Sequence, residues 1–371
     1  MTFLFAADID LYSSSPKVVR KKIQNSQKLL ESKKYISAYN SLNDSNPYII
    51  LKKTEILVSY STKITSPKNF ILSENGKTEA IQFESSVFSE NQGANEKEKS
   101  ILALARAFYT SKMLRVFPNN QDFSVDSALN DYDFAFSRGV YSALYALDYA
   151  SILSAVGNVE ESCKWFGEAA QLYQTNGDAW YNYAYMLFAL ENYEKCLEAS
   201  EKAAQCYKNN PEYAEEAYLM RGDAYINLSN FEKAKESFEK AISVNPSEAI
   251  PHLRLGVLLV QTEELPRGRA ELQKAYELSP KNYRILSQLL QTLTGAGYVE
   301  EAEDFCNKNI VLQAGNDYAV AFLYYYLANI QIANDKKKEA LSALDKAEEF
   351  FAKAGIIDGA NSIAELRKQC L

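Results

Sequence analysis

The 371-residue sequence contains little histidine, tryptophan, glycine or proline. It has 1 histidine, 2 tryptophans, 14 glycines and 9 prolines. Glycine and proline interrupt regular helices, so their scarcity favours long helical segments. The single histidine, His252, has no second histidine with which to form a recognisable zinc site.

Cysteine is also sparse, and its five residues are scattered without any CxxC pair. Zinc sites and redox pairs need closely spaced ligands, so neither class of site is indicated. We expect reduced thiols that serve as small hydrophobic side chains on helical core positions. They are Cys163, Cys196, Cys206, Cys306 and Cys370.

Excess positive charge and long apolar runs are missing as well. The formal net charge is −8, which argues against a general nucleic-acid surface. No apolar run approaches the ~20 residues of a transmembrane helix. Residues 1–7 resemble the tail of a signal peptide without its basic start. Two expectations follow: a cytoplasmic protein, or an exported one whose true start lies upstream of Met1.

The chain is rich in tyrosine, with 26 residues, and it carries an internal repeat. Residues 177–210 and 215–246 each contain two helical patterns with small and aromatic residues in the same order. The second copy places Gly222 in its first helix and Ala234 and Ala241 in its second, and it closes at Pro246. This order at a spacing of about 34 residues resembles the tetratricopeptide repeat (TPR).

Further copies extend the pattern in both directions. Equivalent first positions are Ala143, Gly177, Glu215, Ala249, Tyr283 and Ala321. Four residues are added before the third and the sixth copy, where residues 209–212 and 313–316 predict longer joints between repeats. A solenoid of stacked hairpins also needs capping elements at its ends. The predicted organisation is a lead-in at 1–16, a divergent helical hairpin at 17–60, an irregular insert or flap at 61–96, a divergent TPR-like hairpin at 97–142, a TPR array at 143–350 and a capping helix at 351–371.

The resemblance implies an all-α, right-handed α-α superhelix with about six regular hairpins. Within the insert at 61–96, Asn75-Gly76 is a two-residue turn signal between two apolar segments, so a β-hairpin is the expected content. Small residues such as Gly222 are expected to let the two helices of a hairpin approach closely.

In TPR proteins the first helices of successive hairpins line a concave groove that usually holds the ligand. By that resemblance the predicted groove residues are Leu144, Leu147, Asp178, Tyr181, Tyr185, Phe188, Leu219, Asp223, Arg284, Phe322, Tyr325 and Asn329. Ser151, Gln291 and Thr294 occupy equivalent positions. A contiguous surface of this apolar character is typical of a binding site.

Three interpretations of this surface remain open. The leading one is a non-catalytic scaffold that binds a helix or an extended apolar peptide of a protein partner. In the second, the insert at 61–96 or the C-terminal helix fills the groove. The third is an envelope-associated protein that binds a small molecule or a glycan. The sequence does not indicate the oligomeric state.

Catalytic and cofactor motifs are not recognisable in the sequence. It has no nucleotide-binding glycine motif, no GxSxG and no HExxH. His252 occupies a packing position of its repeat and lacks a recognisable catalytic partner. Some TPR proteins grip a C-terminal carboxylate with Lys, Asn and Arg at fixed positions, and only Asn182 matches that set here. We therefore expect neither an enzyme nor a cofactor.

Overall fold

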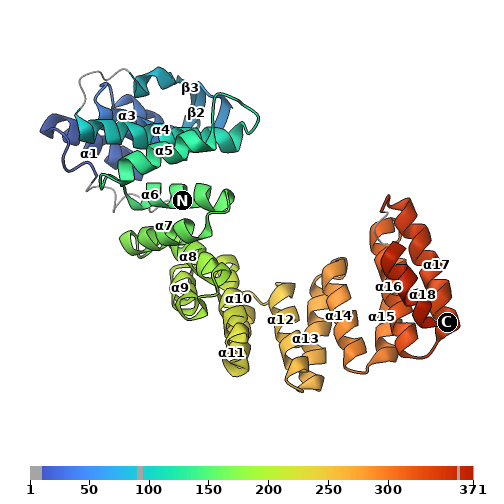
Figure 1. Cartoon of the computed structure of the whole chain (residues 1–371). Helices are drawn as coiled ribbons and strands as arrows, with labels where there is room; N and C mark the ends of the chain where they lie inside the picture. The colour runs from blue at the N-terminus through green and yellow to red at the C-terminus, as the bar shows by residue number, and fades with distance from the viewer. Residues whose placement is uncertain (1–10, 90–94, 357–359, 371) are drawn as a thin grey trace. The chain divides into compact units, whose positions relative to one another are not determined.

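The computed structural model describes residues 11–89, 95–356 and 360–370, and helices dominate it (Figure 1). Contacts within the chain divide it into two compact units, residues 1–206 and residues 207–371. Each unit consists mainly of consecutive helical pairs in which neighbouring helices pack side by side. Each is described below by itself.

The first unit begins with helices that precede the regular repeats. Ser32, Lys33 and Lys34 separate the first two, and Lys33 adopts a left-handed conformation with φ of 56°. Asn46 caps the third helix, because its side chain accepts a hydrogen bond from the backbone N–H of Tyr48. The helices are α1 (Lys17–Glu31), α2 (Tyr35–Asn40) and α3 (Pro47–Tyr60).

Residues 63–82 form a three-stranded antiparallel sheet in the order β1-β2-β3. Asn75 and Gly76, with φ of 49° and 78°, make the two-residue turn between β2 and β3. The sheet therefore contains the expected hairpin and one further strand, which the sequence did not indicate. The elements are β1 (Lys63–Ser66), β2 (Asn69–Glu74), β3 (Lys77–Gln82) and the short 3-10 helix η2 (Ser85–Phe88).

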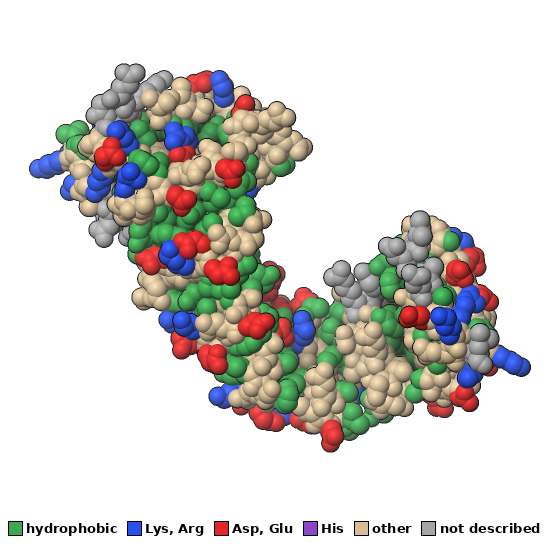
Figure 2. Space-filling view, viewed as in Figure 1, with side chains coloured by type: hydrophobic (Ala, Val, Ile, Leu, Met, Phe, Trp, Pro, Cys, Tyr) green, Lys and Arg blue, Asp and Glu red, His purple; other side chains and the backbone are tan. Residues whose placement is uncertain are grey.

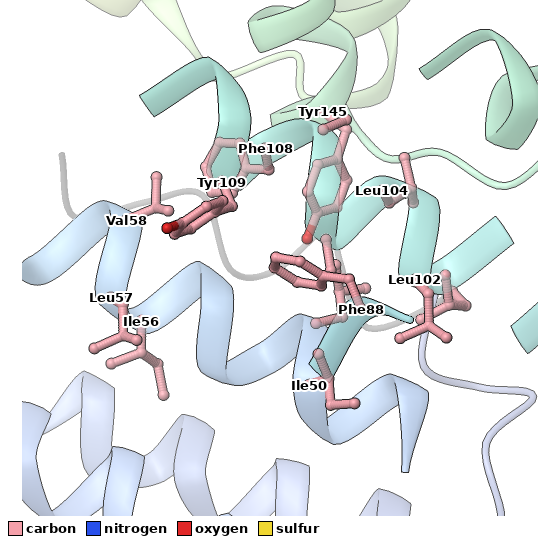
Figure 3. Packing of buried hydrophobic residues seen from close by; sticks show 14 of the residues in the cluster. Ile50, Ile56, Leu57, Val58, Phe88, Leu102, Leu104, Phe108, Tyr109 and Tyr145 are labelled. Atoms are coloured by element: carbon pink, nitrogen blue, oxygen red, sulfur yellow. The ribbon is translucent and has the colours of Figure 1, made fainter. Parts of the chain in front are cut away.

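One face of this sheet joins the hydrophobic core of the first unit. Phe70 and Leu72 of β2 are fully buried, and the rings of Phe83 and Phe88 pack against Tyr109. Figure 3 shows neighbouring parts of this core, including Val58, Phe108 and Tyr145. The Phe108 and Tyr145 rings meet edge to face at 5.4 Å between centroids. Aromatic contacts with Tyr109 thus attach the insert to α4.

Three helical hairpins complete the first unit. Helix α4 begins with a capping box in which Asn95 and Glu98 exchange side-chain and backbone hydrogen bonds. The helices are α4 (Glu96–Val116) with α5 (Val125–Phe136), α6 (Ala143–Ala155) with α7 (Val159–Leu172), and α8 (Gly177–Ala189) with α9 (Tyr193–Cys206).

The second unit continues the same architecture with four hairpins and a final helix. They are α10 (Pro211–Asn227) with α11 (Phe231–Val244), α12 (Ala249–Gln261) with α13 (Leu265–Leu278), α14 (Tyr283–Gly295) with α15 (Val299–Leu312), and α16 (Asp317–Ala333) with α17 (Lys337–Lys353), followed by α18 (Ala360–Cys370). Helix α18 packs on α17 and α16. Its Ile363 and Leu366 are buried.

The predicted longer joints are wrong in one respect. Every connection between successive regular repeats has four residues, including 207–210 and 313–316. The added residues instead lengthen the first helix, since α10 and α16 have 17 residues where α8 and α12 have 13. Backbone N–H groups in the first turn of a helix have no partner within the helix, so proline, which lacks an N–H, is well tolerated there. Pro211 accordingly begins the extra turn of α10.

One buried amide, that of Asn309, occupies a repeat position where alanine is usual. Asn309 of α15 is fully buried, and its Nδ2 donates to the Tyr276 hydroxyl at 3.1 Å and to the Phe305 carbonyl at 2.9 Å. These partners offset the cost of burying an amide where other repeats carry alanine.

Candidate functional site

The predicted groove residues lie on the first helices of their hairpins and none of the described ones is fully buried. Tyr185 is the most exposed large side chain among them, at 55%. The side chain of Arg284 lies outside the described residues. On the face shown in Figure 2, hydrophobic side chains appear between charged ones along the helices. The first-helix positions therefore present partly exposed apolar surface.

In the first unit, a cleft of about 290 Å³ brings three predicted residues together. Leu144 and Leu147 of α6 and Asp178 of α8 line it. We call it the α6 cleft. Its full lining is Glu55, Val58, Ser59, Tyr60, Phe108, Lys112, Arg115, Leu144, Leu147, Asp148, Ser151, Asp178 and Asn182.

Most charged groups of the α6 cleft are held by partners. Arg115 Nη2 lies 2.5 Å from Asp148 Oδ1, and the Tyr132 hydroxyl donates to Asp148 Oδ2 at 2.7 Å. Glu55 pairs with the buried ammonium of Lys52. Half-buried Lys112 has no ion pair within the described part of the chain. The cleft thus combines an aliphatic and aromatic floor with one available cation.

The second unit has a comparable cleft of about 300 Å³ between α14 and α16. We call it the α16 cleft, and its lining is Leu290, Gln291, Thr294, Gly295, Tyr325, Tyr326, Asn329 and Ile330. The Gln291 amide donates to the Tyr326 hydroxyl at 3.1 Å, and the rings of Tyr325 and Tyr326 meet edge to face at 6.0 Å. Leu290 and Ile330 are buried below them. The cleft has an apolar floor and polar tyrosine walls.

The remaining predicted residues lie outside both clefts. Phe188 packs edge to face on Tyr193 of its own hairpin, and Phe322 contacts the rings of Tyr318 and Phe351. These two phenylalanines therefore contribute to packing within their hairpins. Tyr181, Tyr185, Leu219 and Asp223 line neither cleft.

Asp223 of α10 is half-buried, with 28% of its side chain exposed, and faces Arg254 of α12. The Arg254 Nη2 lies 3.7 Å from Asp223 Oδ2. Burial raises the pKa of Asp223, and the charge of Arg254 opposes that rise. Partial removal of a carboxylate from water disfavours its charged form. The raised pKa of Asp223 therefore indicates that this position on the first-helix face is partly excluded from water.

No described residue of the insert or of the final helix lines these clefts. The α6 cleft is formed by α3, α4, α6 and α8, and the α16 cleft by α14 and α16 alone. Among the described residues, the sheet and α18 contribute no lining side chain. The self-filled groove therefore has no support at these two places.

Sequence reasoning missed the α3 and α4 side of the α6 cleft. Val58 and Tyr60 come from the end of α3, and Phe108 and Lys112 from α4. The α4 side could have been predicted, because α4 is the first helix of the hairpin predicted at 97–142. Extending the repeat pattern to this hairpin would give the α4 residues that face the groove. The repeat pattern does not predict that the end of α3 packs beside α4 and α6.

The described residues contain no group of three or more His, Cys, Asp or Glu side chains placed to hold a metal ion. His252 Nδ1 lies 2.6 Å from Glu271 Oε2, between α12 and α13. Helices long and apolar enough to cross a bilayer are not found in the part of the chain that the structure covers.

Comparisons with known proteins point to one family. The tetratricopeptide repeat family matches residues 215–248. The BBSome complex member BBS4 of Bos taurus is 25% identical over 171 residues, which is 46% of this chain and 32% of that protein. The TPR repeat-containing protein MJ1428 of Methanocaldococcus jannaschii is 24% identical over 216 residues, 53% of this chain and 37% of that protein. The chain thus spans about a third of each of these relatives.

Among solved structures, a tetratricopeptide repeat protein from Parabacteroides merdae is similar with a TM-score of 0.48 and 19% identity, covering 72% of this chain and 98% of that one. TPR proteins generally mediate protein–protein interactions. The repeat spacing, the consecutive helical pairs and the family match at 215–248 identify the chain as a tetratricopeptide repeat protein.

Proposed function

We propose that this TPR protein is a non-catalytic scaffold that binds an extended apolar segment of a protein partner on its first helices. The observation that carries the proposal is the α6 cleft, where a repeat-derived prediction and an independent cavity coincide at Leu144, Leu147 and Asp178. An aliphatic floor with a polar rim suits side chains of an extended peptide.

Tyr185 extends this surface beyond the cleft. Asp178, Asn182 and Tyr185 are spaced four and three residues apart on α8, so they share one helix face. A tyrosine buries a large apolar area at a small loss of side-chain freedom, which is why such residues anchor interfaces. Being 55% exposed in the unbound chain, Tyr185 has most of its surface available for a partner.

The test uses random twelve-residue peptides displayed on phage and selected on the full chain. Affinities of the selected peptides are measured by fluorescence anisotropy for the wild type and for Tyr185→Ala. We expect a loss of about tenfold or more, the size of an interface hot spot. The matched control is Phe231→Ala, an exposed aromatic residue at the start of a second helix.

Equal losses in Tyr185→Ala and Phe231→Ala would show that the first-helix face is not the binding surface. A chain that selects no peptide but binds an oligosaccharide array through Tyr325 would favour the glycan alternative instead.

A further inference from the structure

The outer edge of β3 is an unpaired backbone surface in the first unit. The register pairs Glu74 with Lys77 next to the turn, and hydrogen-bonded pairs then alternate along the two strands. The backbone N–H and C=O groups of Thr78, Ala80 and Gln82 consequently point away from β2. A hydrogen bond on the other side of β2 agrees with this alternation. The N–H of Thr62 donates to the carbonyl of Ile71 at 2.8 Å, so Ile71, which lies opposite Ala80, directs its backbone groups toward β1.

No described residue supplies partners for these outward groups. The backbone hydrogen bonds of the described chain include none from Thr78, Ala80 or Gln82 to another segment. Five of the six β3 residues have exposed side chains. Within the described residues, the outward backbone groups of β3 therefore have no hydrogen-bonding strand beside them.

The two edges of the sheet differ in how they are protected. The β1 edge has four residues and an irregular register between Ile64 and Ser66. Short strands and bulges of this kind hinder pairing with another chain. The six residues of β3 pair with β2 without interruption and include no proline. Of the two edges, β3 is the better template for an added strand.

A crevice of about 540 Å³ adjoins the end of this strand. Gln82, Phe83 and Glu84 form one wall, and residues of α2, α3 and their connection form the other. We call it the β3 crevice. Its lining is Tyr39, Asn43, Asp44, Ser45, Ile50, Lys53, Gln82, Phe83, Glu84 and Val87.

The charges of the β3 crevice leave one cation available. Asp44 Oδ2 lies 3.1 Å from Lys22 Nζ, and Glu84 Oε2 lies 2.8 Å from Lys68 Nζ. Lys53 is half-buried with its Nζ 5.0 Å from the centre of the Tyr39 ring. Within the described residues Lys53 has no ion pair. Burial lowers the pKa of Lys53, and the negative charge of Asp44 opposes this effect more weakly. The charged ammonium is therefore poorly compensated, and a carboxylate of a bound peptide would stabilise it.

We infer that the β3 edge binds an extended peptide as a fourth strand, with an acidic side chain of that peptide placed in the crevice beside Lys53. Backbone hydrogen bonds to Thr78, Ala80 and Gln82 supply affinity, and the crevice supplies specificity. This site does not depend on the first-helix face and is a second interaction surface of the chain.

The test selects random seven-residue phage peptides on the full chain and measures them by anisotropy. Ala80→Pro removes one outward N–H without removing a bond to β2, and Lys53→Met keeps the aliphatic stem but removes the charge. We expect selected peptides to carry Asp or Glu, and each variant to lose at least tenfold in affinity. Lys77→Met, an exposed cation on the same strand, and Tyr185→Ala are the controls and should stay within about twofold.

Amide hydrogen exchange on the wild-type chain decides the outcome even if Ala80→Pro misfolds. Peptide binding should slow exchange at Thr78, Ala80 and Gln82. Unchanged exchange at these amides, or peptides that lose affinity in Tyr185→Ala and keep it in Lys53→Met, would overturn the inference. The latter result would leave the proposed first-helix site intact.

Discussion

Lys52 and Glu55 form an ion pair in the interior of the first unit, with Nζ 2.8 Å from Oε2. Their side chains are only 2% and 1% exposed. Glu55 Oε1 also accepts hydrogen bonds from the hydroxyls of Tyr12 at 2.7 Å and Tyr145 at 2.5 Å. One carboxylate therefore joins the N-terminal segment, α3 and α6 beneath the α6 cleft.

Removing one partner of this pair should strongly destabilise the first unit. Lys52→Met leaves the Glu55 charge buried without its cation, which should lower the free energy of unfolding by about 3–5 kcal/mol. Urea denaturation followed by circular dichroism measures it. Lys99→Met is the matched control, because Lys99 pairs with Glu96 at the same spacing and distance on an exposed surface. A similar effect of both substitutions would contradict the importance of burial.

At Gly222 in the second unit, an added Cβ would overlap the side chain of Phe238 on the second helix of the same hairpin. A Cβ there would lie 2.2 Å from Cε1 of Phe238, whose side chain is fully buried. Gly222→Ala should therefore cost roughly 1–3 kcal/mol through overpacking. Gly295→Ala is the comparison, since its Cβ would meet no atom within 4 Å, and it should be as stable as the wild type. Thermal unfolding of both variants compares them, and equal melting temperatures would refute the packing argument.

The turns inside the six regular hairpins share a left-handed residue. Two of them use glycine, such as Gly157 with φ of 81°, and four use other residues, such as Glu263 with φ of 65°. At both turns the next residue donates its N–H back to a helix carbonyl, as Glu264 does to Leu259 at 2.8 Å. The backbone of Glu263 is thus strained by its side chain.

Replacing that residue with glycine should relieve the strain. A side chain in the left-handed region costs roughly 1–2 kcal/mol, part of which glycine loses again through unfolded-state entropy. Glu263→Gly should therefore stabilise by about 0.5–1 kcal/mol, and Gly157→Ala should destabilise in the opposite direction. Guanidinium denaturation measures both, and a loss of stability in Glu263→Gly would show that its side chain matters more than its backbone.

Asp223 should make the second unit more stable as the pH falls. Burial raises its folded-state pKa, so the native state binds a proton at a higher pH than the unfolded state does. The contribution is fully present below the unfolded pKa and is lost as the pH rises through the raised folded pKa. Asp223→Asn should remove this dependence and stabilise the protein at neutral pH. Urea denaturation of the wild type and of Asp223→Asn at several pH values from 4 to 8 tests this prediction. A difference in the free energy of unfolding that stays constant across that range would contradict it.

The repeat spacing was sufficient to predict the paired helices, because small residues such as Ala234 and Gly222 recur where helices touch. The extra turn of α10 was misplaced, because a proline after asparagine marks a helix start and a loop equally well. In α10 the helix begins at Pro211 itself.

The sheet and the clefts were less predictable. Asn75-Gly76 encodes its turn locally, but β1 is four residues long and irregular, and so has too short a pattern to detect. The wall of the α6 cleft formed by Val58 and Tyr60 depends on packing between distant segments. Local patterns carry no information about such contacts, so the α3 wall of the candidate site could not be placed from sequence.

Photo-crosslinking tests the central claim most directly. A benzophenone amino acid replaces Tyr185 on the first-helix face or Phe231 on a second helix, and each full-length variant is irradiated with a selected twelve-residue peptide. Mass spectrometry then measures the fraction of chain joined to peptide. The proposed function predicts efficient crosslinking from position 185 and little from position 231. Equal crosslinking at both positions, or crosslinking from 231 alone, would contradict it.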